Sequence, residues 1–412
     1  MKIFSNLNNK NHKNLVTIFL AGIFFWSSIF SLLPTLPIYI GTLTQSFEQI
    51  GIIMGSFSVG TIVFRSYCGK LSDRKGRGYM MQLGLVVAMI IPLSYALSNY
   101  IPLLIFLRVV HGISIAAYDS SYNALVSDIA PVEKRGEVIG YMSLVQPIGF
   151  VFGPTIGGLT YQFLGYQLLF VSASLLALVG YLLIFQIRSK INENNIQEPV
   201  SIKKPARSGF WQTILSARVI TPALVLLSLG CGFGTLTAFM PILMQQKHIS
   251  INAGTYYTIA ALSGFMVRFF VGRVSNQWGR GIFISIGICF YALSMAIIYF
   301  ASYDYEFVLS GIVEGFGSGL VFPGTVALLA DRTFIQERGY IIGIAWIGFD
   351  LGIAISGPLM GMLISLVGIT NIFAIATGVC LLGLVAFATQ SNKSISDSLK
   401  FAVGKTGDRF AT

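Results

Sequence analysis

The sequence predicts an all-α integral membrane protein in which twelve transmembrane helices form two pseudo-symmetric six-helix bundles. Three observations support this fold class. Hydrophobic residues make up 54% of the chain and charged residues only 10%. Twelve apolar runs approach the length of a membrane span, and one polar loop between two such runs recurs once in each half of the sequence.

The composition excludes a soluble protein. A soluble domain carries about 25% charged residues, so a soluble fold of this chain would leave too much apolar surface in water, and the bilayer must be its solvent. The net charge of +11 does not indicate nucleic-acid binding, because the basic residues lie in short segments between the apolar runs. We interpret the four scattered cysteines as small packing residues and expect neither a metal nor a cofactor. These cysteines are Cys68, Cys231, Cys289 and Cys380.

The apolar runs give the positions of the spans. A transmembrane helix needs about 20 predominantly apolar residues. The first run follows a polar, basic N-terminus and precedes no small-residue cleavage site, so we interpret it as a membrane helix and not as a signal peptide. The predicted spans are residues 15–40, 49–68, 79–98, 101–128, 138–160, 164–187, 218–245, 252–272, 281–302, 306–331, 339–364 and 368–390.

The basic residues predict the orientation. Lys247 is the single Lys or Arg in the loops that follow odd-numbered spans, whereas the opposite loops and both tails are rich in them. Lys and Arg near span ends mark the cytoplasmic side, so we expect both termini in the cytoplasm and the spans in the cell (inner) membrane. The predicted domains are an N-terminal bundle (1–187), a polar cytoplasmic linker (188–217) and a C-terminal bundle with a cytoplasmic tail (218–412).

The polar loop at residues 69–77, GKLSDRKGR, has a weaker copy at residues 272–280, GRVSNQWGR. The two are separated by 203 residues, the difference between 272 and 69. A run of identities in one register indicates a duplication. The same offset pairs Arg65 with Arg268, Gly112 with Gly315, Asp128 with Asp331, Arg135 with Arg338, Gly140 with Gly343 and Gly149 with Gly352.

The loop carries the pattern G-x-L-x-D-R-x-G-R, met by Gly69, Leu71, Asp73, Arg74, Gly76 and Arg77. In this it resembles the major facilitator superfamily, and the resemblance covers nearly the whole chain. The resemblance implies a conformational latch that holds the halves in the outward-facing state, formed by Gly69, Asp73, Arg74, Gly76, Arg77 and Asp128.

Physical chemistry adds expectations about individual loop residues. We expect Gly76 to allow a tight turn, Asp73 to lie near a helix N-terminus, where an anion is favoured, and Asp128 to be the acid that pairs with Arg77. The alternative is that these charges serve only as an orientation signal. Asn276 replaces the acid in the second copy, so a latch there should be weaker.

The fourth predicted span holds three ionisable side chains: Arg108, His111 and Asp119. A charge at the bilayer centre costs about 2.5–3.5 kcal/mol on insertion scales, so such residues should face partners or a wet cavity. Arg108 and Asp119 are eleven residues apart, about three turns, and so lie nearly on one helix face. The R-x-x-x-G pattern at Arg108 resembles a superfamily motif linked to proton coupling. His111 is either a titratable group in that role or a neutral hydrogen-bonding residue.

The fifth span carries spaced glycines that resemble the antiporter motif of drug–proton exporters. Spaced glycines let helices approach closely, and a proline bends the helix. The alternative is generic small-residue packing, and Gly343, Gly352, Gly357 and Pro358 repeat part of the pattern in the second half. The motif residues are Gly140, Gly149, Gly153, Pro154, Gly157 and Gly158.

Two acids lie inside predicted spans of the second half, Glu314 and Asp350. Glu314 falls 203 residues after His111, so duplication predicts that the two approach a central cavity from opposite sides. A buried carboxyl suits a group that loads and releases protons. For each acid the alternative is a static partner of an arginine or a backbone group.

These patterns predict a secondary transporter that exports a small amphipathic, drug-like compound by proton antiport with alternating access. An exporter of one metabolite (a sugar or a metal-chelating compound) and a proton-coupled importer are the alternatives. We expect no enzyme activity, and the P-loop pattern G-x-x-x-x-G-K-[ST] is absent. The expected partners are the substrate, protons and the lipid bilayer, with no nucleic acid, and the chain is expected to be a monomer. The sequence names neither the substrate nor the proton stoichiometry.

Overall fold

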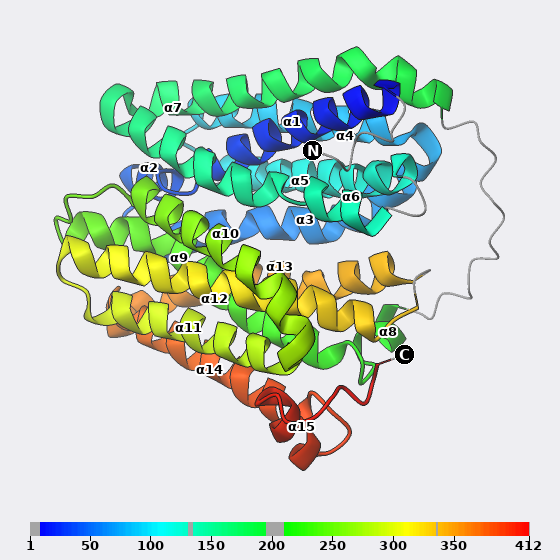
Figure 1. Ribbon diagram of the computed structural model, residues 1–412. Helices are drawn as coiled ribbons and strands as arrows, with labels where there is room; N and C mark the ends of the chain where they lie inside the picture. The colour runs from blue at the N-terminus through cyan, green and yellow to red at the C-terminus, as the bar shows by residue number, and fades with distance from the viewer. Residues whose placement is uncertain (1–8, 131–134, 195–209, 335–336, 412) are drawn as a thin grey trace. The chain divides into compact units, whose positions relative to one another are not determined.

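The computed structural model describes residues 9–130, 135–194, 210–334 and 337–411, with side chains for all of these except 9–12, 135–136, 187–194, 210 and 269–278. Every regular element in these ranges is a helix (Figure 1). Asn276 and the centre of the second loop copy therefore lie outside the described side chains, and residues 195–209 of the predicted linker lie outside the described residues.

The predicted number of spans is confirmed for the described part of the chain. Ten helical segments there are long and apolar enough to cross a membrane. One of them, residues 137–186, contains two spans, because α7 (Val145–Asn194) changes course at Gly165, whose φ is +79°. α10 (Ala253–Trp278) completes the set of twelve.

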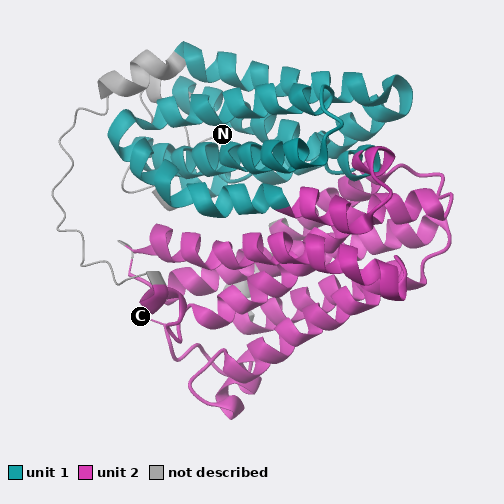
Figure 2. Ribbon diagram, turned by 180° about the vertical axis from the view of Figure 1, so that it is seen from behind, with its two compact units in different colours: residues 1–39, 56–200 teal, residues 40–55, 201–412 magenta. Residues whose placement is uncertain are grey.

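The first compact unit comprises residues 1–39 and 56–200 (Figure 2). Its helices are α1 (Asn9–Ser31), the start of α2 (Leu36–Leu43), most of α3 (Phe47–Lys75), α4 (Arg77–Tyr95), α5 (Ile101–Ile129), α6 (Arg135–Met142) and α7. α1 packs along α7, and α4 packs on both α5 and α7. Its core includes Phe25 and Tyr118, whose rings stack with centroids 3.9 Å apart.

The fifth predicted span is interrupted between α6 and α7 at residues 143–144. Pro147 explains the position of this break, because proline has no N–H to donate to the carbonyl four residues earlier, at Ser143. α7 then continues through Pro154, which the helix accommodates.

The second unit comprises residues 40–55 and 201–412. It contains α8 (Phe210–Ile214), α9 (Ile220–Gln246), α10, α11 (Arg280–Phe300), α12 (Asp304–Asp331), α13 (Arg338–Val367), α14 (Asn371–Gln390) and α15 (Ile395–Ala402). α13 packs on α9, α12 on α10 and α11, and α14 on α9 and α11. Residues 40–55 were assigned to the N-terminal bundle by sequence, and the domain boundaries stay a prediction.

Three of the four cysteines are buried, as small packing residues should be: Cys68, Cys231 and Cys380. Cys289 is exposed on α11, so the packing interpretation is wrong for that residue. The sequence also missed α15, which is too short and too polar to register as a span.

Candidate functional site

The loop between α3 and α4 is a tight turn at Gly76, whose φ of +97° is a conformation that glycine adopts without strain. Arg77 follows as the first residue of α4, and its side chain contacts three others. Its guanidinium lies 2.5 Å from Oδ1 of Asp73, 3.4 Å from Oδ2 of Asp128 and 3.3 Å from Oγ of Ser72. The structure thus brings together Arg77 and the acid at the end of α5.

One expectation about this loop is wrong. Asp73 lies in the last turn of α3, and no side chain caps α4. A carboxylate is disfavoured at a helix C-terminus, so Arg77 and not a helix dipole supplies the positive charge. The remaining loop residues are peripheral, since a β-carbon added at Gly69 would meet no atom within 4 Å and Arg74 is exposed.

The second half repeats this geometry. Gly279 has a φ of +86°, and Nε of Arg280 lies 3.2 Å from Oδ2 of Asp331. These residues stand 203 positions after Gly76, Arg77 and Asp128. The duplication inferred from sequence therefore extends to a turn and an ion pair at the same helix ends.

Arg108 and His111 lie together on α5, deeply buried in the first unit. The Arg108 guanidinium lies 4.5 Å from the centre of the Phe57 ring, and the His111 ring meets the same ring edge-on at 5.3 Å. Nδ1 of His111 is 2.9 Å from the Tyr95 hydroxyl. Among the described residues, Nε2 of His111 has no hydrogen-bond partner.

Asp119 belongs to a different cluster. One of its carboxylate oxygens lies 3.9 Å from Arg65 of α3, and Asn123 donates to the other at 3.0 Å. The helix-face argument placed Asp119 with Arg108, but side chains three turns apart on one helix reach different neighbours. The basic residue that meets Asp119 is therefore Arg65 of α3 and not Arg108 of its own helix.

The glycines of the antiporter motif form a stripe along α7 that contacts α1. A β-carbon at Gly153 would lie 2.7 Å from the carbonyl oxygen of Ser27, and one at Gly157 would overlap the carbonyl of Ser31. Gly149 meets Trp26 in the same way. Pro154 and Gly158 are buried beside the stripe, whereas Gly140, on α6, has open space around it. The motif thus divides into residues that permit close helix packing and one that does not take part in it.

Glu314 is 3% exposed on α12, in the second unit. The charged side chain that acts on it is Arg268 of α10, one turn from the end of the predicted span. Three fully buried tyrosines, Tyr256, Tyr257 and Tyr291, are close enough to Glu314 to interact with its charge. Glu314 is therefore a buried carboxyl within electrostatic range of one arginine and three tyrosine hydroxyls.

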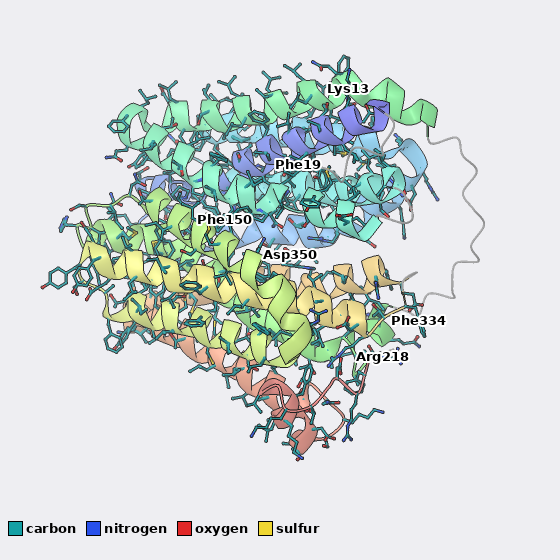
Figure 3. All side chains as sticks on the ribbon, in the orientation of Figure 1. Lys13, Phe19, Phe150, Arg218, Phe334 and Asp350 are labelled. Atoms are coloured by element: carbon teal, nitrogen blue, oxygen red, sulfur yellow. The ribbon has the colours of Figure 1, made fainter. Side chains whose placement is uncertain are left out.

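Asp350 lies half-buried on α13 (Figure 3). The residue before it, Phe349, belongs to an aromatic cluster that the sequence analysis did not predict. Phe349 is the centre of this cluster. Its ring lies 5.4 Å from both Phe322 and Trp346 and 5.6 Å from Phe233. Trp346 and Asp350 are four residues apart on one helix and so share a face. The signal in the sequence was this spacing, W-x-x-F-D, but apolar spans contain many aromatic residues and the pattern is not distinctive.

The described residues include no cluster of His, Cys, Asp and Glu that could hold a metal ion. The candidate functional side chains among these residues are therefore single ionisable groups inside helices. Such groups can bind charged ligands and exchange protons, and they are also typical of the pathways of membrane transport proteins.

A sequence model of the Major Facilitator Superfamily matches residues 18–304 and 267–403. The chain belongs to the major facilitator superfamily. Among curated relatives, the "multi-drug resistance efflux pump PmrA homolog" of Lactococcus lactis is 25% identical over 86% of this chain and 89% of its own. The "quinolone resistance protein NorA" of Staphylococcus aureus is 23% identical over 91% and 95%. The "multidrug resistance protein MdtG" of Salmonella paratyphi A is 24% identical over 91% and 95%.

Solved structures of superfamily members share the fold. The nucleoside transporter NupG, solved as a point mutant, aligns with a TM-score of 0.73 over 92% of this chain and 99% of that chain, at 14% identity. A bacterial homologue of the human lysosomal transporter Spinster aligns with a TM-score of 0.66 over 97% and 93%, also at 14% identity. This superfamily member is thus a multi-pass membrane transporter of small molecules.

Proposed function

We propose that this transporter exports amphipathic, drug-like compounds from the cell in exchange for protons. Two findings support the direction of transport and the substrate class. The three relatives named above are called efflux or drug-resistance proteins and match about nine-tenths of the chain. The glycine stripe on α7 is the pattern that resembles drug–proton exporters. We also propose that both termini are cytoplasmic, because the basic residues gather at one set of helix ends.

The burial of Glu314 is the single observation on which the proposed proton coupling depends. Glu314 is 3% exposed and lies within a membrane span, away from bulk water. Among the described side chains, Arg268 is the one cation that interacts electrostatically with its carboxyl group. A carboxylate in such surroundings is costly when charged and unpaired. We propose that Glu314 accepts a proton in one conformation and pairs with Arg268 after releasing it in another.

The aromatic cluster beside Asp350 supports the substrate class. Flat apolar rings with one carboxylate offer dispersion contacts, cation–π attraction and a counter-charge to an amphipathic cation. In this proposal Trp346, Phe349 and Asp350 contact the substrate. The first half differs at the equivalent positions, where Ser143, Gln146 and Pro147 stand. Substrate contacts of this kind would therefore come from one unit only.

The Arg77–Asp128 contact supports a conformational latch. The pair joins the start of α4 to the end of α5 and is partly exposed, with side-chain exposures of 22% and 44%. Exposed ion pairs contribute only about 0–1 kcal/mol. A contact of that size is strong enough to bias two conformations and weak enough to break in every cycle, as alternating access requires.

Transport by the purified chain in proteoliposomes tests the proposal. A fluorescent amphipathic cation is placed outside, and a pH gradient of either sign is imposed. We expect accumulation that reverses with the gradient and disappears when an ionophore collapses it. Equal uptake with and without a gradient would contradict antiport. Gradient-driven movement of a nucleoside or sugar, with none of the cation, would favour the exporter of a single metabolite or an importer.

A further inference from the structure

The short helix α15 is attached firmly to the second unit, although it follows the last span. It begins soon after α14 ends at Gln390, and Oγ of Ser394 caps it by accepting a hydrogen bond from the Asp397 N–H at 3.1 Å. Phe401 faces inward, with its ring 6.0 Å from that of Phe387 on α14. Its carbonyl lies so close to Gly281 of α11 that no β-carbon would fit there.

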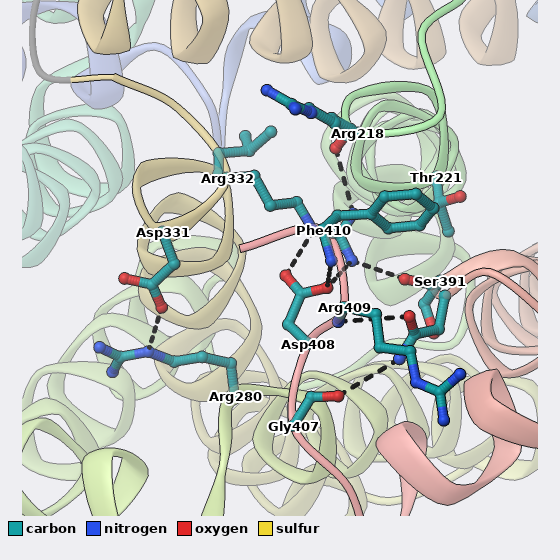
Figure 4. Close-up of polar contacts among 12 residues, drawn as sticks. Arg218, Thr221, Arg280, Asp331, Arg332, Ser391, Gly407, Asp408, Arg409 and Phe410 are labelled. Atoms are coloured by element: carbon teal, nitrogen blue, oxygen red, sulfur yellow. Dashed lines mark hydrogen bonds and ion pairs between the residues drawn. The ribbon is translucent and has the colours of Figure 1, made fainter. Parts of the chain in front are cut away.

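An ion pair fixes the chain that follows α15 (Figure 4). Arg332, at the end of α12, has a fully buried side chain. Its Nε and Nη2 donate hydrogen bonds to the two carboxylate oxygens of Asp408, at 2.7 Å and 3.1 Å. Its other donors bind the carbonyls of Arg218 and Ser391, at 3.1 Å and 2.6 Å. The Phe410 ring lies 5.2 Å from the guanidinium. With anchors before and after it, α15 presents a defined outer surface.

That outer surface carries an apolar stripe. Ile395, Leu399 and Val403 are 64%, 49% and 53% exposed. They follow one another every four residues and so lie on one side of the helix. On α14, Leu382 and Val385 are also exposed, at 68% and 56%, as lipid-facing residues of a span must be. The stripe therefore begins a short distance along the chain from a lipid-facing surface.

The charges beside the stripe are positive. Both acidic residues of the tail already form ion pairs, Asp408 with Arg332 and Asp397 with Arg409, the latter at 2.9 Å. Three exposed lysines then remain on and around α15: Lys393, Lys400 and Lys405. An apolar stripe flanked by lysines matches the membrane–water boundary, where acyl chains lie beneath anionic headgroups.

We propose that α15 is an interfacial helix that binds the surface of the bilayer. Ile395, Leu399 and Val403 insert between the lipid chains, and the three lysines bind anionic headgroups. The helix thereby fixes the end of α12, through Arg332 and Asp408, to the membrane surface. This inference requires only that the chain spans a membrane and does not depend on the substrate or on proton coupling.

Spin labels on α15 test the insertion. Cysteines are introduced singly at Ile395 or Leu399, and at Lys400 as the control, in a Cys289→Ser background that removes the exposed native thiol. In nanodiscs, labels at 395 and 399 should be accessible to oxygen and shielded from a water-soluble nickel complex, with the opposite behaviour at 400. Exposure of all three labels to nickel would overturn the proposal. So would shielding that appears only at high protein density, because it would indicate a second copy as the occupant.

Lipid charge tests the lysines. The label at 399 is compared in phosphatidylcholine nanodiscs with and without phosphatidylglycerol. Each lysine near an anionic surface contributes about fivefold to membrane affinity, so the anionic lipid should increase shielding of the label. The variant with Lys393, Lys400 and Lys405 all changed to Gln should lose this response, and the matched Lys→Arg variant should keep it. An identical response in all three proteins would overturn the headgroup assignment.

Discussion

Nε of Arg77 lies 3.4 Å from Oδ2 of Asp128, and this contact joins the start of one membrane helix to the end of the next. Arg280 and Asp331 form the same contact, at 3.2 Å, in the second half. The duplication of the chain has therefore preserved a polar contact as well as the apolar spans. Two equivalent contacts also allow each to serve as a control for the other.

Loss of the Arg77 contact should affect transport more than stability. Arg77→Ala removes two partly exposed ion pairs, with Asp73 and Asp128, each worth about 0–1 kcal/mol, so we expect a small change in the unfolding temperature. Loss of the Asp128 contact alone shifts the balance between two transport conformations by up to about fivefold, which a transport rate reports directly. Lys70→Ala, in the same loop, exposed and outside the proposed latch, is the matched control. Equal transport rates in the two variants would remove the latch from the mechanism.

The glycine stripe should separate into sensitive and tolerant positions. Gly157→Ala places a methyl group against the Ser31 carbonyl and should cost about 1–3 kcal/mol of stability. Gly140→Ala enters open space within a helix, where alanine is favoured over glycine by about 1 kcal/mol. Thermal unfolding in detergent measures both. A Gly140→Ala variant as unstable as Gly157→Ala would show that the motif acts through something other than packing on α1.

The tail should depend on Asp408. Asp408→Asn leaves the charge of Arg332, which is fully buried, without its counter-charge, and breaking a buried pair costs about 3–5 kcal/mol. Arg409→Ala breaks an ion pair whose arginine is 57% exposed and should cost less than about 1 kcal/mol. Limited proteolysis of the C-terminus, together with thermal unfolding, compares them. If the two variants were equally stable, the anchoring of α15 through Arg332 would be refuted.

Asp350 should distinguish charged from neutral substrates. Asp350→Asn removes the carboxylate beside the aromatic cluster, so we expect the Kd of an amphipathic cation to rise by about tenfold, a change of about 1.4 kcal/mol. The Kd of a neutral compound of similar shape should change little. Trp346→Ala should weaken both compounds, because it removes apolar contact area as well as a ring face. Equal losses for the cation and the neutral compound in Asp350→Asn would contradict a role in charge recognition.

The fold could be predicted closely because its causes are local in the sequence. Each span is visible in the sequence as an apolar run. The turn at Gly76 could be predicted because a glycine stands there between charged residues. The pairing of Arg77 with Asp128 was also accessible, because the duplication marks both positions. The predicted spans and the observed helices consequently differ mainly at their ends, where polar loop residues continue the helices.

The missed features depend on which helices become neighbours. Periodicity placed Arg108 and Asp119 on one face of α5, but it could not say that Phe57 would meet one and Arg65 the other. Arg332 and Asp408 belong to no shared motif and are 76 residues apart. The aromatic cluster around Phe349 draws on α9, α12 and α13. Such contacts appear only when the helices are packed together.

The most direct test of the account is transport by Glu314→Gln, with Glu137→Gln as the control, since Glu137 is exposed at the start of α6. Each variant is assayed twice in proteoliposomes, for accumulation driven by a pH gradient and for exchange of labelled against unlabelled substrate without a gradient. We expect Glu314→Gln to retain exchange and to lose gradient-driven accumulation, while Glu137→Gln keeps both. Gradient-driven accumulation by Glu314→Gln at the rate of the unaltered protein would contradict the assignment of Glu314 as the proton-coupling residue.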